Sequence, residues 1–173
     1  VDLHRRHVVE RFDRIGPTGR RGVVTLRALD AAHPGLGRGT WADAARRLAA
    51  GGWITREDLD RITRLHCFGR QIANTDMHWG NLSFFLPEAS PFTLAPVYDM
   101  LPMHFRPGNT GEIQDREFRP GLPKPEDHEA WLAMYPVALG FWRRLTSHAA
   151  ISSDFRGIAA IAAAKLERLL LSI

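Results

Sequence analysis

The chain has 173 residues, of which 45% are hydrophobic, and its formal net charge at pH 7 is +4. This length suits one globular domain with its own hydrophobic core. The sequence contains no run of about 18 apolar residues that could span a bilayer, and its single cysteine, Cys67, excludes an internal disulfide framework and a cysteine-based zinc site. We therefore expect a folded cytoplasmic domain that makes no membrane contact and uses Cys67 for core packing.

Arginine supplies almost all of the positive charge, because the only lysines are Lys124 and Lys165. A basic chain can bind nucleic acid, but here the arginines are mixed with acidic residues. In the segment TREDLDRITR at 55–64, opposite charges three and four positions apart would support one another on a helix. A solvated, salt-bridged surface is the favoured interpretation, and we expect no direct binding of nucleic acid by this chain.

Two short strands are predicted near the start of the chain. Residues 7–14 (HVVERFDR) and 20–29 (RRGVVTLRAL) are rich in β-branched and aromatic side chains, and the turn-forming sequence IGPTG lies between them. The two strands are therefore expected to lie on either side of a turn.

Two helices follow, and each has a sequence signal at its first turn. Thr40 is the expected N-cap of a short helix, with Asp43 three residues later and a glycine pair at 51–52 to end it. The second helix begins at Thr55, which is expected to form a capping box with Asp58. Apolar residues recur on one face of this helix at intervals of three and four, and they are Leu59, Ile62, Leu65, Phe68 and Ile72.

A hairpin and a helical C-terminal region complete the chain. Residues 82–86 and 92–99 are expected to form two short strands joined by the turn PEASP. The segment 106–125 is rich in proline, glycine and charge, so it is expected to be a loop or lid. The remainder is expected to be helical, with a kink or break at Pro136 and a serine cap at Ser152. The predicted fold class is α+β and predominantly helical.

The segment 73–86 (ANTDMHWGNLSFFL) concentrates polar side chains between a predicted helix and a predicted strand. The helix delivers the chain to a loop that holds Asp76, His78 and Asn81. The second strand of the hairpin is expected to bring Asp99 back beside that loop. Carboxylate and amide oxygens suit Mg²⁺, a hard cation that prefers oxygen ligands and often shares them with substrate phosphates.

The spacing within this loop predicts a phosphotransferase. Asn81 follows Asp76 by five positions, which is the separation of aspartate and asparagine in the kinase catalytic loop H-R-D-x-x-x-x-N, and Asn74 and Thr75 stand where that loop has histidine and arginine. Phosphoryl transfer needs an aspartate to accept the hydroxyl proton, and an asparagine and a second aspartate to hold metal on the nucleotide. An isolated aspartate or histidine in a loop is most often structural, so the prediction depends on the whole set.

The predicted site carries two geometric expectations. If Asn81 and Asp99 share one ion, their side-chain oxygens lie within about 6 Å of each other. Four apolar residues are expected to pack together beneath the loop and to hold it rigidly, and they are Phe68, Ile72, Leu82 and Phe84.

Three strings in the sequence occur in the order found in one protein family. They are VVERFDR at 8–14, FGRQIANTDMHWGNLSFFL at 68–86 and LAPVYDMLPM at 94–103. They resemble the HipA family of toxin-type serine/threonine kinases, in which the first string links the two kinase lobes. The D-x-H-x-x-N pattern by itself indicates only the phosphotransferase class, because phosphoinositide kinases and aminoglycoside phosphotransferases share it. The flanking strings indicate a HipA-like protein.

The resemblance implies ATP and Mg²⁺ as cofactors and assigns roles by position. Asp76 would be the catalytic base, and Asn81 and Asp99 would be the magnesium ligands. His78 would lie near the transferred phosphate, where it would serve both catalysis and nucleotide binding.

The N-terminal string would contribute to nucleotide binding. Glu10 and Phe12 would meet the adenine through backbone groups, and Asp13 would approach the ribose. The alternative interpretation is that Glu10, Arg11 and Asp13 form a charged strand face.

Two departures from the family pattern bear on the expected site. Many relatives have a lysine just before the asparagine where this chain has Gly80, which puts one phosphate contact in doubt. The YDML string at 98–101 lacks the glycine of the kinase D-F-G motif, so a switch of that kind is not assumed.

Residues 1–173 are interpreted as the C-terminal lobe of such a kinase. The sequence shows neither a glycine-rich phosphate-covering loop nor a lysine on a strand, so we expect the N-terminal lobe to be absent from this chain and the isolated chain to fold yet be almost inactive. The resemblance implies a protein substrate, with an aminoacyl-tRNA synthetase as one candidate, and a small DNA-binding antitoxin as partner. Two alternatives stay open: a small-molecule phosphotransferase of the aminoglycoside-kinase type, and a non-catalytic regulator or scaffold with a kinase-like fold.

Overall fold

The computed structural model describes residues 10–32, 35–88, 91–108 and 116–171. Helices supply most of the regular structure in these ranges, and they are α1 (Leu26–Ala32), α2 (Trp41–Ala50), α3 (Arg56–Gln71), α4 (His128–Ser147) and α5 (Ser153–Leu170). The strands are β1 (Arg14–Ile15), β2 (Gly19–Arg20), β3 (Val23–Thr25), β4 (Ser83–Phe85) and β5 (Thr93–Leu94). Short 3₁₀ helices occur at η1 (Trp79–Asn81), η2 (Met103–Phe105) and η3 (Pro125–Asp127). The predicted α+β, predominantly helical fold class is confirmed.

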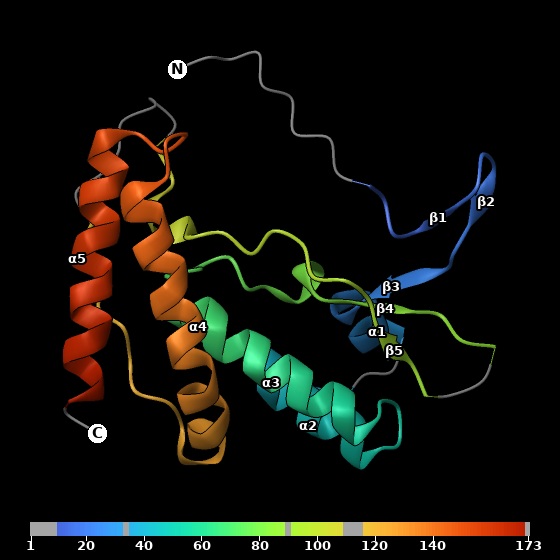
Figure 1. Cartoon of the computed structure of the whole chain (residues 1–173). Helices are drawn as coiled ribbons and strands as arrows, with labels where there is room; N and C mark the ends of the chain where they lie inside the picture. Colours follow the sequence, from blue (N-terminus) through green and yellow to red (C-terminus); the bar gives the residue numbers. More distant parts are fainter. Residues whose placement is uncertain (1–9, 33–34, 89–90, 109–115, 172–173) are drawn as a thin grey trace.

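Helix α3 occupies the middle of the molecule (Figure 1). It packs against α2 on one side and α4 on the other, and α5 lies alongside α4. The strands gather on the opposite side of the molecule from α5, and two long extended stretches of chain connect them to the helical side (Figure 1). None of the helices in the described ranges combines the length and the apolar character needed to cross a membrane.

The central sheet has the order β3, β4, β5 and is antiparallel throughout. Phe84 lies opposite Val24 on one side and Leu94 on the other, and all three residues of β4 are buried. The predicted hairpin of residues 82–86 and 92–99 is therefore confirmed, although both strands are shorter than expected.

The two predicted N-terminal strands are only partly found. β1 and β2 pair across the predicted turn, but residues 10–13 form no strand and residues 7–9 lie outside the described ranges. The predicted strand at 20–29 is wrong beyond Thr25, because helix α1 begins at the next residue. The N–H of Leu26 donates to the carbonyl of Leu82 (2.8 Å), which turns the chain away from the sheet and buries Leu26 completely.

The first predicted capping box is confirmed and the second is half formed. The Asp43 N–H donates to Thr40 Oγ1 (3.2 Å), and the Thr40 N–H donates back to Asp43 Oδ2 (2.9 Å). At α3 the Asp58 N–H donates to Thr55 Oγ1 (3.0 Å), but the Asp58 carboxylate accepts from the N–H of Leu94 in β5 instead of closing the box (3.3 Å). Asp58 is buried against the sheet, so a tertiary contact replaces the local one.

Helix α4 continues through Pro136, so the expected break is wrong, and the expected kink stays a prediction. Proline removes one backbone hydrogen bond from a helix interior, but Pro136 lies on the exposed face. Trp131 before it and Trp142 after it are both fully buried. Packing on both sides of the proline therefore holds the helix together.

Two hydrophobic clusters form the core. The first contains Ile72, Trp131 and Trp142 and joins α3, α4 and α5, whereas the second contains Leu82 and Phe84 and joins the sheet to α1, α2 and α3. The expectation that Phe68, Ile72, Leu82 and Phe84 pack as one group is wrong, because the first two belong to the first cluster and the last two to the second. The expected core position of Cys67 in the first cluster is confirmed.

A network of charges fastens the segment before α4 to helix α2. Arg46 of α2 donates to the carboxylate of Asp127, which is 2% exposed, and Lys124 Nζ donates to both carboxylate oxygens of Asp43 (2.8 and 2.9 Å). Burial on its own would raise the pKa of Asp43, but hydrogen bonds from Lys124 and Thr40 lower it well below its ordinary value of 3.8. The end of the predicted loop at 106–125 is therefore anchored.

His66 on α3 is buried close to this network. Within the described ranges its Nδ1 has no hydrogen-bond partner. Burial, followed by the charge of Arg70, lowers the pKa of His66 to about 4 from an ordinary value of 6.5. His66 is therefore neutral in the folded protein at pH values where it is protonated in the unfolded chain.

This difference predicts a loss of stability in mild acid. Between pH 6.5 and about 4 the unfolded chain binds a proton that the folded chain does not, so the stability present above pH 6.5 falls as the pH drops, by up to about 3 kcal/mol. Urea unfolding across this range should show a smaller loss in His66→Gln than in the wild type. The matched control is His128→Gln at the exposed start of α4, which should behave as the wild type. An equal loss in His66→Gln and wild type would contradict the assignment.

Candidate functional site

The candidate site begins where helix α3 ends. Ala73 adopts a left-handed conformation (φ 61°), which turns the chain out of the helix, and the Asn74 N–H closes the turn on the carbonyl of Gly69 (2.8 Å). The carbonyl of Ala73 accepts a hydrogen bond from the N–H of His104 (3.0 Å), which lies beyond the hairpin. The loop entrance is thus fixed to both the helix and a distant segment.

Asn74 connects the predicted base to the predicted metal-binding segment. Its Oδ1 accepts a hydrogen bond from the N–H of Asp76 (2.9 Å), and its Nδ2 donates to the carbonyl of Asp99 (3.3 Å) and contacts Met100 Sδ (3.4 Å). One side chain therefore brings the backbone of Asp76 and that of Asp99 into one neighbourhood. The sequence motif did not single out Asn74 for this role.

Asn81 closes the loop from its other end. Its Nδ2 donates to the carbonyl of Asp76 (2.9 Å), and its N–H donates to the carbonyl of His78 within η1 (3.0 Å). Within the described part of the chain, Oδ1 of Asn81 accepts no hydrogen bond. Asn81 thus holds the backbone of Asp76 through its side-chain nitrogen, and its role as a metal ligand stays a prediction.

His78 faces Asp76 with a defined tautomer. The Gly80 N–H donates to His78 Nδ1 (3.0 Å), so the proton of the neutral ring is on Nε2, which lies 3.9 Å from Asp76 Oδ1. That distance is too long for a hydrogen bond, and both side chains are partly exposed, at 46% and 39%. The His78 carbonyl accepts from Trp41 Nε1 (3.0 Å), which fixes this part of the loop to α2.

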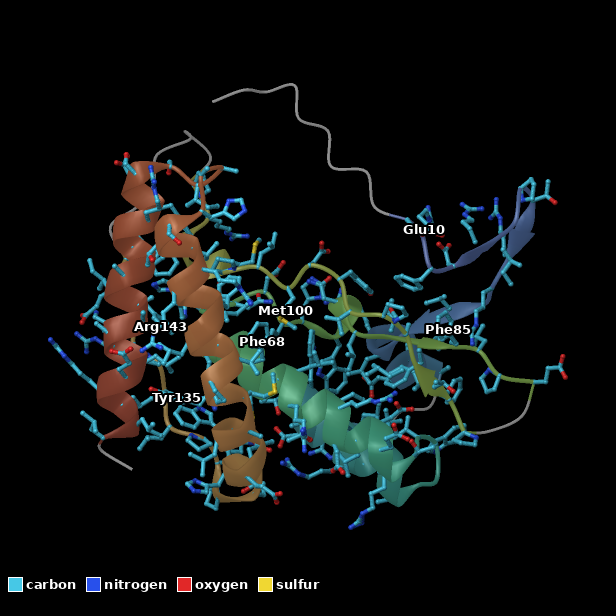
Figure 2. All side chains as sticks on the ribbon, viewed as in Figure 1. Glu10, Phe68, Phe85, Met100, Tyr135 and Arg143 are labelled. Atoms are coloured by element: carbon cyan, nitrogen blue, oxygen red, sulfur yellow. The ribbon has the colours of Figure 1, made fainter. Side chains whose placement is uncertain are left out.

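Asp99 lies at the start of the segment that leaves the hairpin. Its backbone is left-handed (φ 53°), a conformation that aspartate tolerates better than most residues, and its side chain is exposed. The separation predicted for the side-chain oxygens of Asn81 and Asp99 stays a prediction. Met100 follows directly and packs against both hydrophobic clusters, where the chain passes from the sheet to the helices (Figure 2).

Magnesium binding at this loop stays a prediction, and the oxygen donors that the loop offers are of the kind this ion shares with phosphates. In the described ranges no group of three or more His, Cys, Asp and Glu residues could hold a metal ion. A site built from three or more of those side chains is therefore not present among these residues. One carboxylate from Asp99 and one amide oxygen from Asn81 match the alternative, in which Mg²⁺ keeps several waters and binds through one or two protein oxygens plus substrate phosphates.

Phe12 joins the N-terminal segment to the site through Tyr98. The Phe12 ring stacks on Tyr98 (centroids 6.1 Å apart) and meets Phe85 edge-on (5.9 Å). Tyr98 Oη donates to the carbonyl of Gly80 (2.9 Å) and is hydrogen-bonded to Ser83 Oγ (2.6 Å). Tyr98 is a second residue that sequence analysis missed, and its position directly before Asp99 was the available signal.

Glu10 and Asp13 lie by the N-terminal hairpin. Glu10 is exposed there, on the same side of the molecule as the sheet (Figure 2). The Arg11 guanidinium donates to both carboxylate oxygens of Asp13 (2.8 and 2.6 Å) and thereby lowers the pKa of Asp13. This ion pair agrees with the charged-face interpretation, and the contact of Asp13 with a ribose stays a prediction.

An open cavity of about 370 Å³ lies directly beside the loop. Asn74 and Thr75, the two residues before Asp76, form part of its wall. The remaining wall comes from the end of α3, from η2 and from residues 117–121, through Arg70, Ala73, His104, Glu117, Phe118, Arg119 and Gly121.

Comparison with known proteins identifies the family. A sequence model of the HipA-like C-terminal domain matches residues 1–165. The chain belongs to this family. The family expected from the three sequence strings is therefore confirmed.

Two similar proteins place this HipA-like domain in a larger context. It is 40% identical over 150 residues to Toxin YjjJ of Escherichia coli (strain K12), and the match covers 87% of this chain and 33% of that protein. It also resembles HipA in the structure of the Shewanella oneidensis MR-1 toxin–antitoxin complex of HipA, HipB and operator DNA, with 20% identity, a TM-score of 0.51 and coverage of 91% of this chain and 46% of that one. The similarity to the Shewanella HipA structure shows that this chain shares its fold. The chain spans about a third of the length of its curated relative.

The close approach of Gly80 to His78 makes a testable prediction. A Cβ at position 80 would lie 2.9 Å from Cε1 and 3.0 Å from Nδ1 of the His78 ring, so Gly80→Ala should displace the ring and weaken the hydrogen bond from the residue 80 N–H to Nδ1. Long-range ¹H–¹⁵N NMR of the imidazole should show a changed Nδ1 signal. The control is Gly157→Ala in α5, where an added Cβ meets nothing within 4 Å. Identical His78 signals in wild type and Gly80→Ala would contradict the geometry.

Proposed function

We propose that this HipA-like domain is the C-terminal catalytic lobe of an ATP- and Mg²⁺-dependent serine/threonine protein kinase of HipA toxin type. The observation that carries the proposal is the double attachment of Asn74, which bonds to the Asp76 N–H and to the Asp99 carbonyl. Phosphoryl transfer requires that a catalytic base and a metal-binding carboxylate both face the phosphoryl group that is transferred. In this domain the side chain of Asn74 holds the segments of Asp76 and Asp99 together.

Asp76 is the proposed catalytic base. Its carboxylate accepts the proton of a serine or threonine hydroxyl as that oxygen bonds to the γ-phosphorus and the bond from the γ-phosphorus to ADP breaks. Asn81 holds the Asp76 carbonyl through Nδ2 and would bind Mg²⁺ through Oδ1, together with an oxygen of Asp99. The ion, when bound, neutralises charge on the phosphates.

His78 and the N-terminal residues complete the proposed nucleotide site. The Nε2–H of His78 points toward Asp76 and is partly exposed, so it can donate to an oxygen of the transferred phosphate. Phe12 and Glu10 would meet the adenine, and the stacking of Phe12 on Tyr98 supports this by linking the N-terminal segment to the residue before Asp99. Asp13 would approach the ribose.

The proposed acceptor is a hydroxyl of a cytoplasmic protein, with an aminoacyl-tRNA synthetase as one candidate. The cavity beside Asn74 and Thr75 leaves space for protein residues that flank the hydroxyl. A DNA-binding antitoxin is the proposed partner, since the similar Shewanella HipA is found with HipB and operator DNA. We further propose that the phosphate-covering loop and its lysine belong to a lobe outside this chain, so that the isolated chain is almost inactive.

Two substitutions in a full-length protein separate the base from the metal ligand. Asp76→Asn should lower phosphate transfer by about 10²- to 10⁴-fold and barely change nucleotide binding, because the base acts on the acceptor hydroxyl. Asp99→Asn should weaken Mg²⁺-dependent nucleotide binding as well as turnover. Radiolabelled phosphate transfer and nucleotide titration measure both effects.

Asp60→Asn, on the exposed face of α3, is the matched control and should behave as the wild type. Transfer to small alcohols in place of protein would indicate a small-molecule phosphotransferase. Full activity in Asp76→Asn would refute the proposed base.

A further inference from the structure

The side-chain amide of Asn74 forms hydrogen bonds through both its oxygen and its nitrogen. Asn74 is 5% exposed, and its donor atom binds the carbonyl of Asp99, which lies 25 positions away in sequence. A buried amide is costly unless it is hydrogen-bonded, and here both of its ends are bonded. Because both ends of the amide are bonded to backbone groups, its contribution passes through its neighbours.

The two backbone positions beside this link are strained. Ala73 and Asp99 are the two non-glycine residues with positive φ in the described ranges, at 61° and 53°. Such conformations are unfavourable for residues with a Cβ and persist only where the surrounding structure enforces them. The Ala73 carbonyl is held by the His104 N–H (3.0 Å), and the Asp99 carbonyl by Asn74 Nδ2 (3.3 Å) and the Leu101 N–H (3.1 Å). The hydrogen bonds thus enforce both conformations.

We propose that Asn74 is a positioning residue that sets the placement of Asp99 relative to Asp76. This inference rests on the proposed kinase function, but the link itself is a property of the fold. An asparagine suits the position because its amide offers one acceptor for the Asp76 N–H and one donor for the Asp99 carbonyl. An aspartate keeps the acceptor and loses the donor, whereas an alanine loses both.

In the full-length protein, amide hydrogen exchange distinguishes the hydrogen bond between Asn74 and Asp76 from the one between Asn74 and Asp99. In Asn74→Asp the Asp76 amide should stay protected, while the Leu101 and His104 amides should exchange about tenfold faster as the Asp99 segment relaxes. In Asn74→Ala all three amides should exchange faster. Asp60→Asn is the matched control, because Asp60 is exposed on α3 and should leave all three unchanged. The backbone amide of Ala138, which is buried in α4, reports whether each variant remains folded.

Kinetics then test the positioning role. A displacement of about 1 Å in a reacting group can cost about 10²-fold in rate, so Asn74→Asp should lower kcat by about that factor and raise the Mg²⁺ concentration needed for half-maximal turnover about tenfold. Asp60→Asn should retain the wild-type Mg²⁺ dependence.

Two results would overturn the inference. Unchanged exchange of the Leu101 and His104 amides in both Asn74 variants would show that Asn74 does not hold the Asp99 segment. Faster exchange with unchanged kcat and Mg²⁺ dependence would show that the link has no part in positioning. A wild-type protein that transfers no phosphate would instead refute the proposed function, and exchange would still decide whether Asn74 couples the two segments.

Discussion

The hydrogen bonds of one buried amide side chain organise the candidate site. Polar loops have few regular backbone partners, yet a catalytic loop must hold its side chains within a fraction of an ångström. In this chain Asn74 binds both the start of the loop and the segment after the hairpin, and Asn81 closes the loop on the carbonyl of Asp76. The loop is thus held by side chains bonded to backbone, and its carboxylates remain available for chemistry.

The two hydrophobic clusters explain why the site lies where it does. One cluster joins α3, α4 and α5, and the other joins the sheet to α1, α2 and α3. The loop leaves the first cluster after Ala73 and joins the second through Met77, Trp79 and Leu82, so its polar residues lie at the junction of the two. Met100 packs against both clusters directly after Asp99, which fixes the returning segment at the same junction (Figure 2).

Sequence reasoning succeeded where the signal is local and failed where a distant contact decides the structure. The capping box of Thr40 and Asp43 and the serine cap of α5 were predictable, because each depends on a few neighbouring residues. The second capping box was not, because the buried Asp58 bonds to β5. The family motif identified the positions of the proposed base and metal ligands, but the role of Asn74 depends on a partner 25 positions away that only the fold brings near.

The most direct test is a crystal structure of the full-length protein with Mg²⁺ and a non-hydrolysable ATP analogue. The account predicts an ion bound at about 2.1 Å by Asn81 Oδ1 and an Asp99 carboxylate oxygen, with phosphate oxygens completing its shell. It also predicts that the Asp76 carboxylate faces the γ-phosphate without binding the ion. An ion or nucleotide bound away from Asn81 and Asp99, or an Asp76 carboxylate turned away from the γ-phosphate, would contradict the account.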